Sequence, residues 1–171
     1  KPLLEKLDQA GIILDISHLA EQAFWESLEI FKGPVIATHN CCRVLCDHDR
    51  QLGDKQISAL VGRDGVIGIA FDDWMLSPLW DKEAMDNTRI SLATVVDHID
   101  HVCQLAGNSK HVAIGTDLDG GYGKEQSPND LDTIADLRCI PSILEKRGYS
   151  PGDVANIMHG NWIRTLKRAW T

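Results

Sequence analysis

Pro34-Val35-Ile36-Ala37-Thr38-His39 is an apolar run that ends in a histidine, and Gly11-Ile12-Ile13-Leu14-Asp15-Ile16-Ser17-His18 is a second run of the same kind. Apolar, β-branched runs of this length are typical of buried strands. The residues between the two runs have room for one helix and two short loops, so we expect the strands to be parallel neighbours. Polar side chains at the carboxyl ends of successive parallel strands mark the active-site face of a β/α barrel. The pattern therefore predicts a reaction centre as well as a fold.

Two further strands are predicted downstream of these runs. Residues 65–71 are apolar throughout, as expected for a parallel strand that is buried on both faces. The run from His111 to Asp117 contains the other strand, over 112–116. Helical patterns alternate with the strands, at residues 1–10, 17–31, 91–106 and 131–147 and from residues 54, 151 and 161 onward. This alternation predicts a parallel sheet with helices outside it.

The expected fold class is α/β, a (β/α)8 barrel of the TIM type with about four β/α units present. A complete barrel usually has ~250 residues, so residues 1–171 are expected to form a single partial domain. The start, Lys1 to Glu5, reads as the middle of a helix and has no signal-peptide pattern. Four parallel strands alone leave two unpaired edges. The half-barrel is therefore expected to belong to a larger domain, to pair with another copy as a homodimer, or to pack as an open sheet.

The composition argues against some partners. A formal net charge of −8 disfavours nucleic acid, because phosphate binding needs clustered Lys and Arg. No apolar run approaches the ~18–20 residues of a membrane span, so no membrane segment is expected. Cys41, Cys42 and Cys46 lie close together without a Cys-x-x-Cys pair. They could form a soft-metal cluster, but free thiols in a reducing compartment are the preferred interpretation, which predicts a cytoplasmic location.

His18, His39 and Asp117 are the candidate reaction centre. Neutral imidazoles suit zinc, and two of them at equivalent strand ends can share an ion, so both histidines are predicted metal ligands rather than packing residues. Asp117 could bind the metal, or accept and return a proton. The alternative for Asp117 is a turn residue with local hydrogen bonds, and this structural role is preferred for the nearby Asp119.

Other polar and aromatic side chains have weaker claims to chemistry. Arg50 follows the second strand and could clamp a carboxylate through its bidentate fork, but a solvated loop arginine is an equal alternative. His98 and His101 lie on one predicted helix, where a packing or surface role is favoured. The Trp-rich loop over residues 72–89 is long enough to be functional or interface-forming, and its side chains could line a substrate pocket.

These residues match a known family in several motifs at once. The sequence resembles the renal (membrane) dipeptidase family, which are zinc peptidases on a metal-dependent hydrolase barrel. The resemblance covers nearly the whole chain but only the carboxyl-terminal half of the family's domain. The stretches that carry it are Asp15-Ile16-Ser17-His18-Leu19, Pro34 to His39, Arg50-Gln51-Leu52-x-Asp54, Gly65 to Gly68 and Gly115 to Gly120.

The resemblance implies roles for four residues. His18 and His39 are implied ligands of one zinc in a two-zinc centre. Arg50 matches the arginine that binds the substrate carboxylate, and Asp117 matches the aspartate that transfers a proton and positions the substrate. The implied function is zinc-dependent hydrolysis of dipeptides, with tolerance for a D-residue at the carboxyl side.

The family's other metal ligands, a His-x-Asp pair and a bridging glutamate, precede the region that matches this chain. Since two imidazoles alone leave zinc under-coordinated, the 171 residues by themselves are expected to be inactive or nearly so. Two alternatives stay open. One is a related amidohydrolase, such as an N-acyl-amino-acid deacylase or a lactonase, acting on another small amide. The other is a non-catalytic half-barrel that dimerises or binds a ligand.

Overall fold

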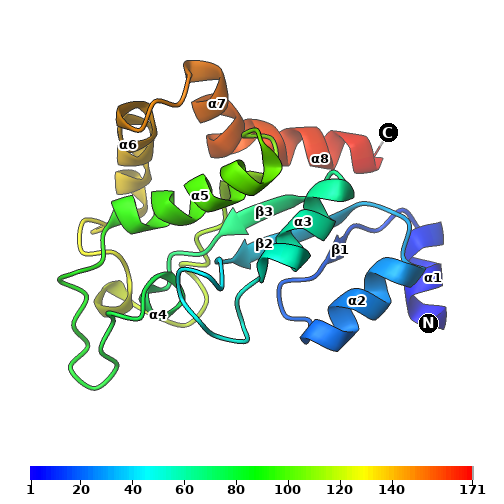
Figure 1. Cartoon of the computed structure of the whole chain (residues 1–171), viewed down its shortest axis with the longest axis horizontal. Coiled ribbons are helices and arrows are strands. Elements are labelled where there is room, and N and C mark those ends of the chain that lie inside the picture. The colour runs from blue at the N-terminus through cyan, green and yellow to red at the C-terminus, as the bar shows by residue number, and fades with distance from the viewer. Residues whose placement is uncertain (171) are drawn as a thin grey trace.

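A computed structural model describes residues 1–170 of the chain. It contains one four-stranded sheet in the order β1-β2-β3-β4, in which every neighbouring pair is parallel. The strands are β1 (Leu14–Asp15), β2 (Val35–Asn40), β3 (Val66–Ile69) and β4 (Val112–Ile114). The predicted number, order and direction of the strands are confirmed, and the strands that lead to His18 and His39 are neighbours (Figure 1).

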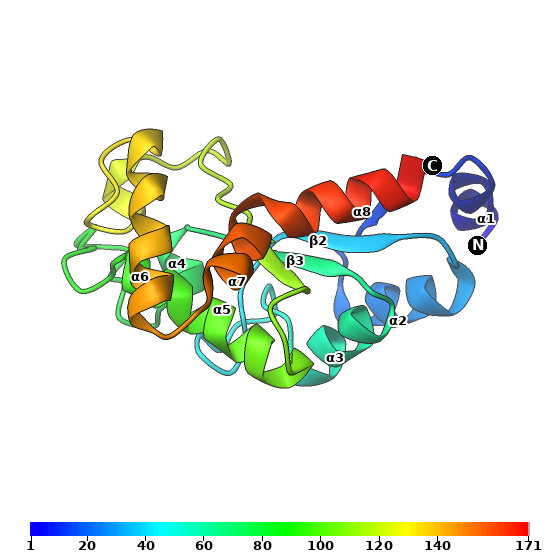
Figure 2. The same cartoon turned by 90° about the horizontal axis from the view of Figure 1, so that it is seen from above.

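Helices cover the sheet in the expected alternation. Figure 2 shows α2, α3 and α5 on one side of β2 and β3, and α8 on the other. Among residues 1–170, no helix is long and apolar enough to cross a membrane. The helices are α1 (Pro2–Gln9), α2 (Glu21–Ile30), α3 (Asp54–Gly62), α4 (Asp73–Leu76), α5 (Leu92–Ala106), α6 (Ile140–Lys146), α7 (Pro151–Ala155) and α8 (Asn161–Trp170), with 3₁₀ turns η1 (Lys124–Gln126) and η2 (Ile134–Cys139) and a π turn η3 (Asn156–Gly160).

Several helices differ from their predicted bounds. The helix expected from residue 17 starts only at Glu21, because residues 17–20 form the loop that carries His18. The predicted helix over 131–147 is a 3₁₀ turn followed by α6, and the break falls at Ile140, next to Pro141 as expected. The loop over 72–89 contains the short helix α4. The two helices predicted from residues 151 and 161 are joined through the π turn η3.

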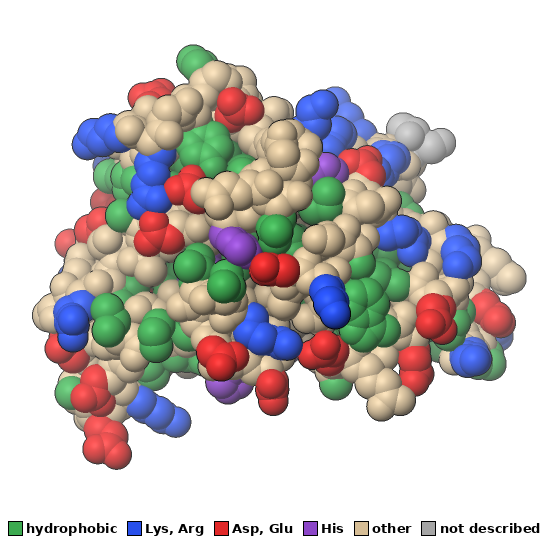
Figure 3. Space-filling view, in the orientation of Figure 1, with side chains coloured by type: hydrophobic (Ala, Val, Ile, Leu, Met, Phe, Trp, Pro, Cys, Tyr) green, Lys and Arg blue, Asp and Glu red, His purple; other side chains and the backbone are tan. Residues whose placement is uncertain are grey.

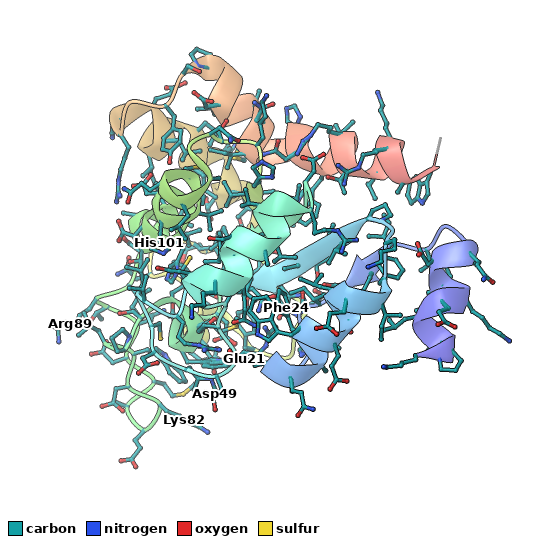
Figure 4. The ribbon with its side chains drawn as sticks, turned by 45° about the vertical axis from the view of Figure 1, so that its right-hand side comes forward. Glu21, Phe24, Asp49, Lys82, Arg89 and His101 are labelled. Carbon is teal, nitrogen blue, oxygen red and sulfur yellow. The ribbon has the colours of Figure 1, made fainter. Side chains whose placement is uncertain are left out.

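The core lies between the sheet and its outer helices. Ile67 and Ile69 of β3 are buried against Phe24 of α2, Ile57 of α3 and Ile99 of α5, in one continuous apolar cluster. Figure 4 shows Phe24 pointing from α2 toward the sheet. Each fully buried side chain of this size contributes roughly 1.5–3 kcal/mol. Figure 3 shows basic and acidic side chains interspersed over the face in view, so the charge there is mixed rather than gathered in one patch.

Two glycines allow β2, β3 and β4 to approach closely. A Cβ atom placed on Gly68 would lie 2.1 Å from the carbonyl oxygen of Thr38, and one placed on Gly115 would lie 2.0 Å from the same oxygen. The added Cβ on Gly68 would also lie 2.9 Å from the ring of Trp162. These positions have no room for a side chain. Since Thr38 directly precedes His39, the glycines define where the end of β2 lies.

The outer edge of β4 is covered by side chains rather than by another strand. The Asn161 amide donates to the carbonyl oxygens of Ser109 (2.7 Å) and Val112 (2.8 Å), and the Trp162 indole donates to that of Ile114 (2.8 Å). Alternate residues of a parallel strand bond to each of its two neighbours, so the carbonyls of Val112 and Ile114 point away from β3. The sequence predicted two bare sheet edges, and the start of α8 caps one of them.

His98 joins α5 to two loops that lead to the carboxyl ends of the strands. Its Nδ1 accepts a hydrogen bond from the backbone N–H of Cys42 (3.0 Å), and its Nε2 lies 2.9 Å from the carbonyl oxygen of Leu76. The imidazole is fully buried, and burial lowers its pKa. An Nδ1 that accepts and an Nε2–H that donates define a single neutral tautomer. The predicted packing role is confirmed by this burial.

We predict that acid destabilises the complete protein through His98. Its pKa is lower in the folded state than the ordinary value of about 6.5. As the pH falls, the imidazole therefore binds a proton in the unfolded chain at a higher pH than in the folded protein. The free energy of unfolding keeps its full value above about pH 6.5. Below that pH it decreases by up to about 1.4 kcal/mol per pH unit. Melting temperatures between pH 5 and 7.5 measure the slope. The melting temperature of His98→Gln should depend less on pH than that of His101→Asn. Equal slopes in the two variants would contradict the role of His98 in the acid destabilisation.

Candidate active site

Two imidazoles meet above the carboxyl ends of β1 and β2. His18 lies in the loop after β1, and His39 lies near the end of β2. Their Nε2 atoms are 2.8 Å apart, with ring centroids separated by 4.8 Å and ring planes tilted by 59°. The His18 side chain is exposed, whereas that of His39 is 17% exposed. The strand-end histidines are therefore brought together, as the sequence pattern predicted.

A hydrogen-bond chain behind His39 sets its tautomer. Thr38 Oγ1 donates its single proton to Asp15 Oδ2 (2.6 Å), so the same oxygen must accept from the Nδ1–H of His39 (2.8 Å). The Nε2 atom of His39 then carries a bare lone pair that faces His18. Burial lowers the pKa of His39, and this effect is larger than the opposite effect of the Asp117 charge. The lowered pKa favours the neutral form of the ring, which is the form that binds metal. Such support of a ligand's second nitrogen is common in metal sites.

Asp15 anchors this chain and was not singled out by sequence reasoning. Its Oδ1 accepts from the Ser17 hydroxyl (2.7 Å), the Ser17 backbone (3.0 Å) and the Thr38 backbone (3.2 Å). Burial would raise the pKa of Asp15, but the hydrogen bonds from Thr38 and Ser17 outweigh it and lower the pKa. The carboxylate thus stays ionised and ties β1 to β2. Its signal in the sequence is the Asp-x-Ser-His spacing.

Asp117 lies three residues beyond β4 and faces His39. Its Oδ2 is 3.9 Å from the Nε2 of His39, and its side chain is 30% exposed. The backbone of Asp117 has φ of 58°, the left-handed conformation that is uncommon for a residue with a side chain. Asp117 is therefore a turn residue whose side chain faces the predicted site. Asp119 is exposed.

Arg50 enters the site from the loop after β2. Its Nη2 donates to the carbonyl oxygen of His39 (3.0 Å), while its Nη1 has no hydrogen-bond partner within residues 1–170. Burial lowers the pKa of Arg50, and the charge of Asp117 opposes this effect. The guanidinium is therefore half-buried at the strand ends, not a solvated loop side chain. One arm holds the backbone of a candidate metal ligand, and the other is buried without a partner within residues 1–170.

The remaining histidines and the clustered cysteines lie outside this centre. His101 bonds to Asp54 on the outer surface, and His159 is exposed. Cys41, Cys42 and Cys46 are buried, and burial raises the pKa of each thiol, so they stay protonated. Their sulfur atoms lie near backbone carbonyl oxygens. This arrangement agrees with free structural thiols.

Asp72 is a further polar residue at the same end of the sheet, three residues beyond β3. It is 7% exposed, and its two carboxyl oxygens accept from Trp74 Nε1 and Gln126 Nε2, each at 2.7 Å. Burial raises the pKa of Asp72, and the charge of Asp117 adds to this. The sequence analysis treated Asp72 only as part of the loop. Its position after an apolar strand nevertheless indicates a candidate site residue, as it does for His39.

The donor set fits a zinc ion in part. The Nε2 atoms of His39 and His18 lie at hydrogen-bond distance from each other, next to a carboxylate and a guanidinium. Among residues 1–170, no group of three or more His, Cys, Asp or Glu side chains is close enough to hold a metal ion. Zinc in proteins is usually four-coordinate, so the two histidines supply half of such a set.

Polar groups gathered at the carboxyl edge of a parallel sheet are typical of the active-site face of β/α barrels. The chain belongs to the membrane dipeptidase family (peptidase family M19), whose family model matches residues 1–171. The resemblance seen in the sequence is thereby confirmed.

Similar proteins extend beyond the length of this chain. It is 30% identical over 168 residues to the "uncharacterized protein in pqqA 5'region" of Klebsiella pneumoniae, covering 98% of this chain and 59% of that protein. It is 29% identical over 170 residues to dipeptidase tcpJ of Claviceps purpurea, of which it covers 37%. Against a metallo peptidase from Rhodobacter sphaeroides, liganded with a phosphinate mimic of the dipeptide L-Ala-D-Ala, the TM-score is 0.86 with 25% identity, covering 99% of this chain and 46% of that one. The chain thus spans about half the length of the relatives it matches.

Proposed function

We propose that residues 1–171 form the carboxyl-terminal half of a dipeptidase barrel, and that the complete protein hydrolyses dipeptides with zinc. The observation that carries the proposal is the meeting of His18 and His39, with Nε2 atoms 2.8 Å apart, beside Asp117 and Arg50 at the strand ends. The family match over the whole chain supports it. The five free cysteines agree with a cytoplasmic location.

His18 and His39 would hold one zinc ion of a two-zinc centre, with further ligands from outside these 171 residues. Bound zinc would supply an activated water and polarise the amide carbonyl. The chain's own contribution is to present the two imidazoles together, with that of His39 in a fixed orientation. Thr38 and Asp15 do this by holding Nδ1 of His39.

Asp117 and Arg50 would act on the substrate. The Asp117 carboxylate has no hydrogen-bond donor among residues 1–170, so its Oδ2, 3.9 Å from His39, is free to take a proton and pass it to the leaving amine. The unpartnered Nη1 of Arg50 would bind the terminal carboxylate of the dipeptide. The two groups would thereby orient the scissile bond between them.

Hydrolysis of L-Ala-D-Ala by the purified complete protein, with and without a zinc chelator, tests the function. We expect turnover that the chelator abolishes and zinc restores. The 171-residue chain alone should show no measurable turnover in the same assay. Absence of turnover by the zinc-loaded complete protein would refute the dipeptidase assignment.

Arg50→Ala should selectively impair substrates with a free carboxylate. Removing one partner of a half-buried charge pair costs enough to lower kcat/KM for L-Ala-D-Ala by about 30-fold or more. The amide of the same dipeptide, which lacks the carboxylate, should be affected far less. Arg89→Ala, which removes an exposed arginine from the loop after α4, is the matched control. Unchanged dipeptide turnover in Arg50→Ala would instead favour a related amidohydrolase.

A further inference from the structure

The backbone on both sides of the Asp117 side chain is held by hydrogen bonds. The carbonyl oxygen of Thr116, just before it, accepts from the backbone N–H of Phe71 (3.0 Å) and from the hydroxyl of Tyr122 (2.8 Å). The carbonyl oxygen of Asp117 itself accepts from the backbone N–H of Gly120 (2.8 Å), which closes a tight turn. A left-handed residue with a side chain persists only where the surrounding structure fixes it. These three hydrogen bonds fix Asp117 from both directions along the chain.

Gly120 packs directly against the side chain of Asp117. A Cβ atom placed on Gly120 would lie 2.8 Å from Oδ2 and 2.9 Å from Cγ of Asp117, and 2.8 Å from its carbonyl oxygen. The backbone of Gly120 is not left-handed, so glycine is required there for space rather than for its conformation. Because one of the contacts is with backbone, a turn of the carboxylate alone would not make room for a larger residue.

The oxygen that lies against Gly120 is the one that faces the site. Oδ2 of Asp117 is 3.9 Å from Nε2 of His39, and the same oxygen would meet the added Cβ. The carboxylate accepts no hydrogen bond among residues 1–170, so no donor there determines its position. Its place beside His39 therefore depends on the turn that Gly120 closes and on the space that Gly120 leaves.

Tyr122 holds the chain on the other side of Asp117. Its side chain is partly buried, and burial raises its pKa, so the hydroxyl stays protonated and donates to Thr116 at neutral pH. Phe71 follows β3 and Thr116 follows β4, so the two hydrogen bonds to Thr116 join the ends of neighbouring strands to the loop. The strand end from which Asp117 projects is thus fixed independently of the turn after it.

We propose that Gly120 and Tyr122 are positioning residues for Asp117: Gly120 provides the space in which the carboxylate faces His39, and Tyr122 holds the strand end before it. The inference rests on the proposed dipeptidase function, in which Asp117 transfers the proton. Neither residue has a role at the reacting atoms, so both act through Asp117 alone. Proton transfer requires close alignment, and a misplacement of about 1 Å can lower a rate by about 100-fold.

Gly120→Ala in the complete, zinc-loaded protein tests the first part. We expect kcat for L-Ala-D-Ala to fall by about 10- to 100-fold and KM to change by less than about threefold, because Arg50 is left in place. Gly123→Ala is the matched control in the same loop. The nearest atoms to its added Cβ belong to the exposed side chain of Glu125, which can turn aside, so its kcat should stay within about twofold of the wild type. A kcat for Gly120→Ala within about threefold of the wild type would overturn the role of Gly120.

A double variant separates positioning from general damage. Gly120→Ala is combined with Asp117→Asn, which removes the group to be positioned but keeps its size. If Gly120 acts through the carboxylate, kcat of the double variant should equal that of Asp117→Asn within about twofold. A further loss of about tenfold in the double variant would show that Gly120 supports the fold in general, and would overturn its positioning role.

Tyr122→Phe keeps the ring and removes only the hydrogen bond to Thr116, so it tests the proposal even if Gly120→Ala does not fold. Its kcat should fall by about threefold to tenfold, the range for one lost hydrogen bond, with KM nearly unchanged. The loss should disappear when Tyr122→Phe is combined with Asp117→Asn. An unchanged kcat would overturn the role of Tyr122. A loss that lies in KM, or that persists beside Asp117→Asn, would overturn it too, because the phenol would then act on the substrate directly.

Failure of the proposed function gives a different result. Crystal structures of the complete wild type and of Gly120→Ala give the distance between Asp117 Oδ2 and His39 Nε2, here 3.9 Å, whether or not a dipeptide is hydrolysed. We expect this distance to be longer in Gly120→Ala by about 1 Å or more. A displaced carboxylate in a protein without dipeptide turnover would refute the dipeptidase assignment and support the positioning by Gly120. An equal distance in the two proteins would overturn the positioning.

Discussion

Asp117→Asn is expected to lower kcat for dipeptide hydrolysis by the complete protein by about two to four orders of magnitude, the range for loss of a positioned acid–base group. Asparagine keeps the size of the side chain and tolerates the left-handed backbone at this position, where φ is 58°. It cannot carry the proton that we propose Oδ2, 3.9 Å from His39, transfers. KM should change much less than kcat, because we propose that Arg50, not Asp117, holds the substrate carboxylate.

Asp119→Asn is the matched control for this variant. It removes the same charge from the same loop at an exposed position two residues away. Its kcat should stay within about twofold of the wild type, as for most surface substitutions. A kcat for Asp117→Asn within tenfold of the wild type would show that the proton moves through another group.

Gly115→Ala is expected to destabilise the complete protein by about 3 kcal/mol or more, at the upper end for overpacking. The added Cβ would lie 2.0 Å from the carbonyl oxygen of Thr38 and 2.7 Å from Cα of Gly68. Both contacts are with backbone, so no side chain can turn aside. Relief requires β2 to move away from β4, and this movement would carry Thr38 and His39 with it. Urea unfolding followed by circular dichroism measures the change.

Gly62→Ala provides the control, because a Cβ at Gly62 in α3 meets nothing within 4 Å. Alanine is the better helix former, so this variant should equal or slightly exceed the wild type in stability. If the free energy of unfolding of Gly115→Ala is within 1 kcal/mol of the wild-type value, the close approach of the strands does not constrain the site as described.

Periodicity and strand ends predicted most of the sheet correctly. Apolar runs gave the four strands and their parallel order, because a buried strand needs a continuous apolar sequence. The lengths of three strands were overestimated, as for the strand expected over 65–71, which is Val66–Ile69, whereas β2 extends to Asn40. The cap on the β4 edge was also missed. Asn161 and Trp162 reach Val112 and Ile114 across about fifty residues, and no local pattern reports such a contact.

The site was predictable where a residue directly follows a strand. His39 lies within the last residues of β2, and His18 and Asp117 follow their strands by a few residues. Arg50 could not be decided from sequence, because a loop arginine is exposed or buried according to how the loop folds back, here onto the carbonyl of His39. Asp72 was missed for a related reason. Its partners Trp74 and Gln126 come from two loops that only the fold brings together.

The zinc content of the complete protein tests the central claim most directly. It is measured by elemental analysis after equilibrium dialysis against zinc, for the wild type, for His18→Asn with His39→Asn, and for His101→Asn. The imidazoles of His18 and His39 are predicted to hold one zinc ion, so the double variant should bind one zinc fewer per chain than the wild type, and His101→Asn should bind as much. Equal zinc content in all three proteins would contradict the metal site.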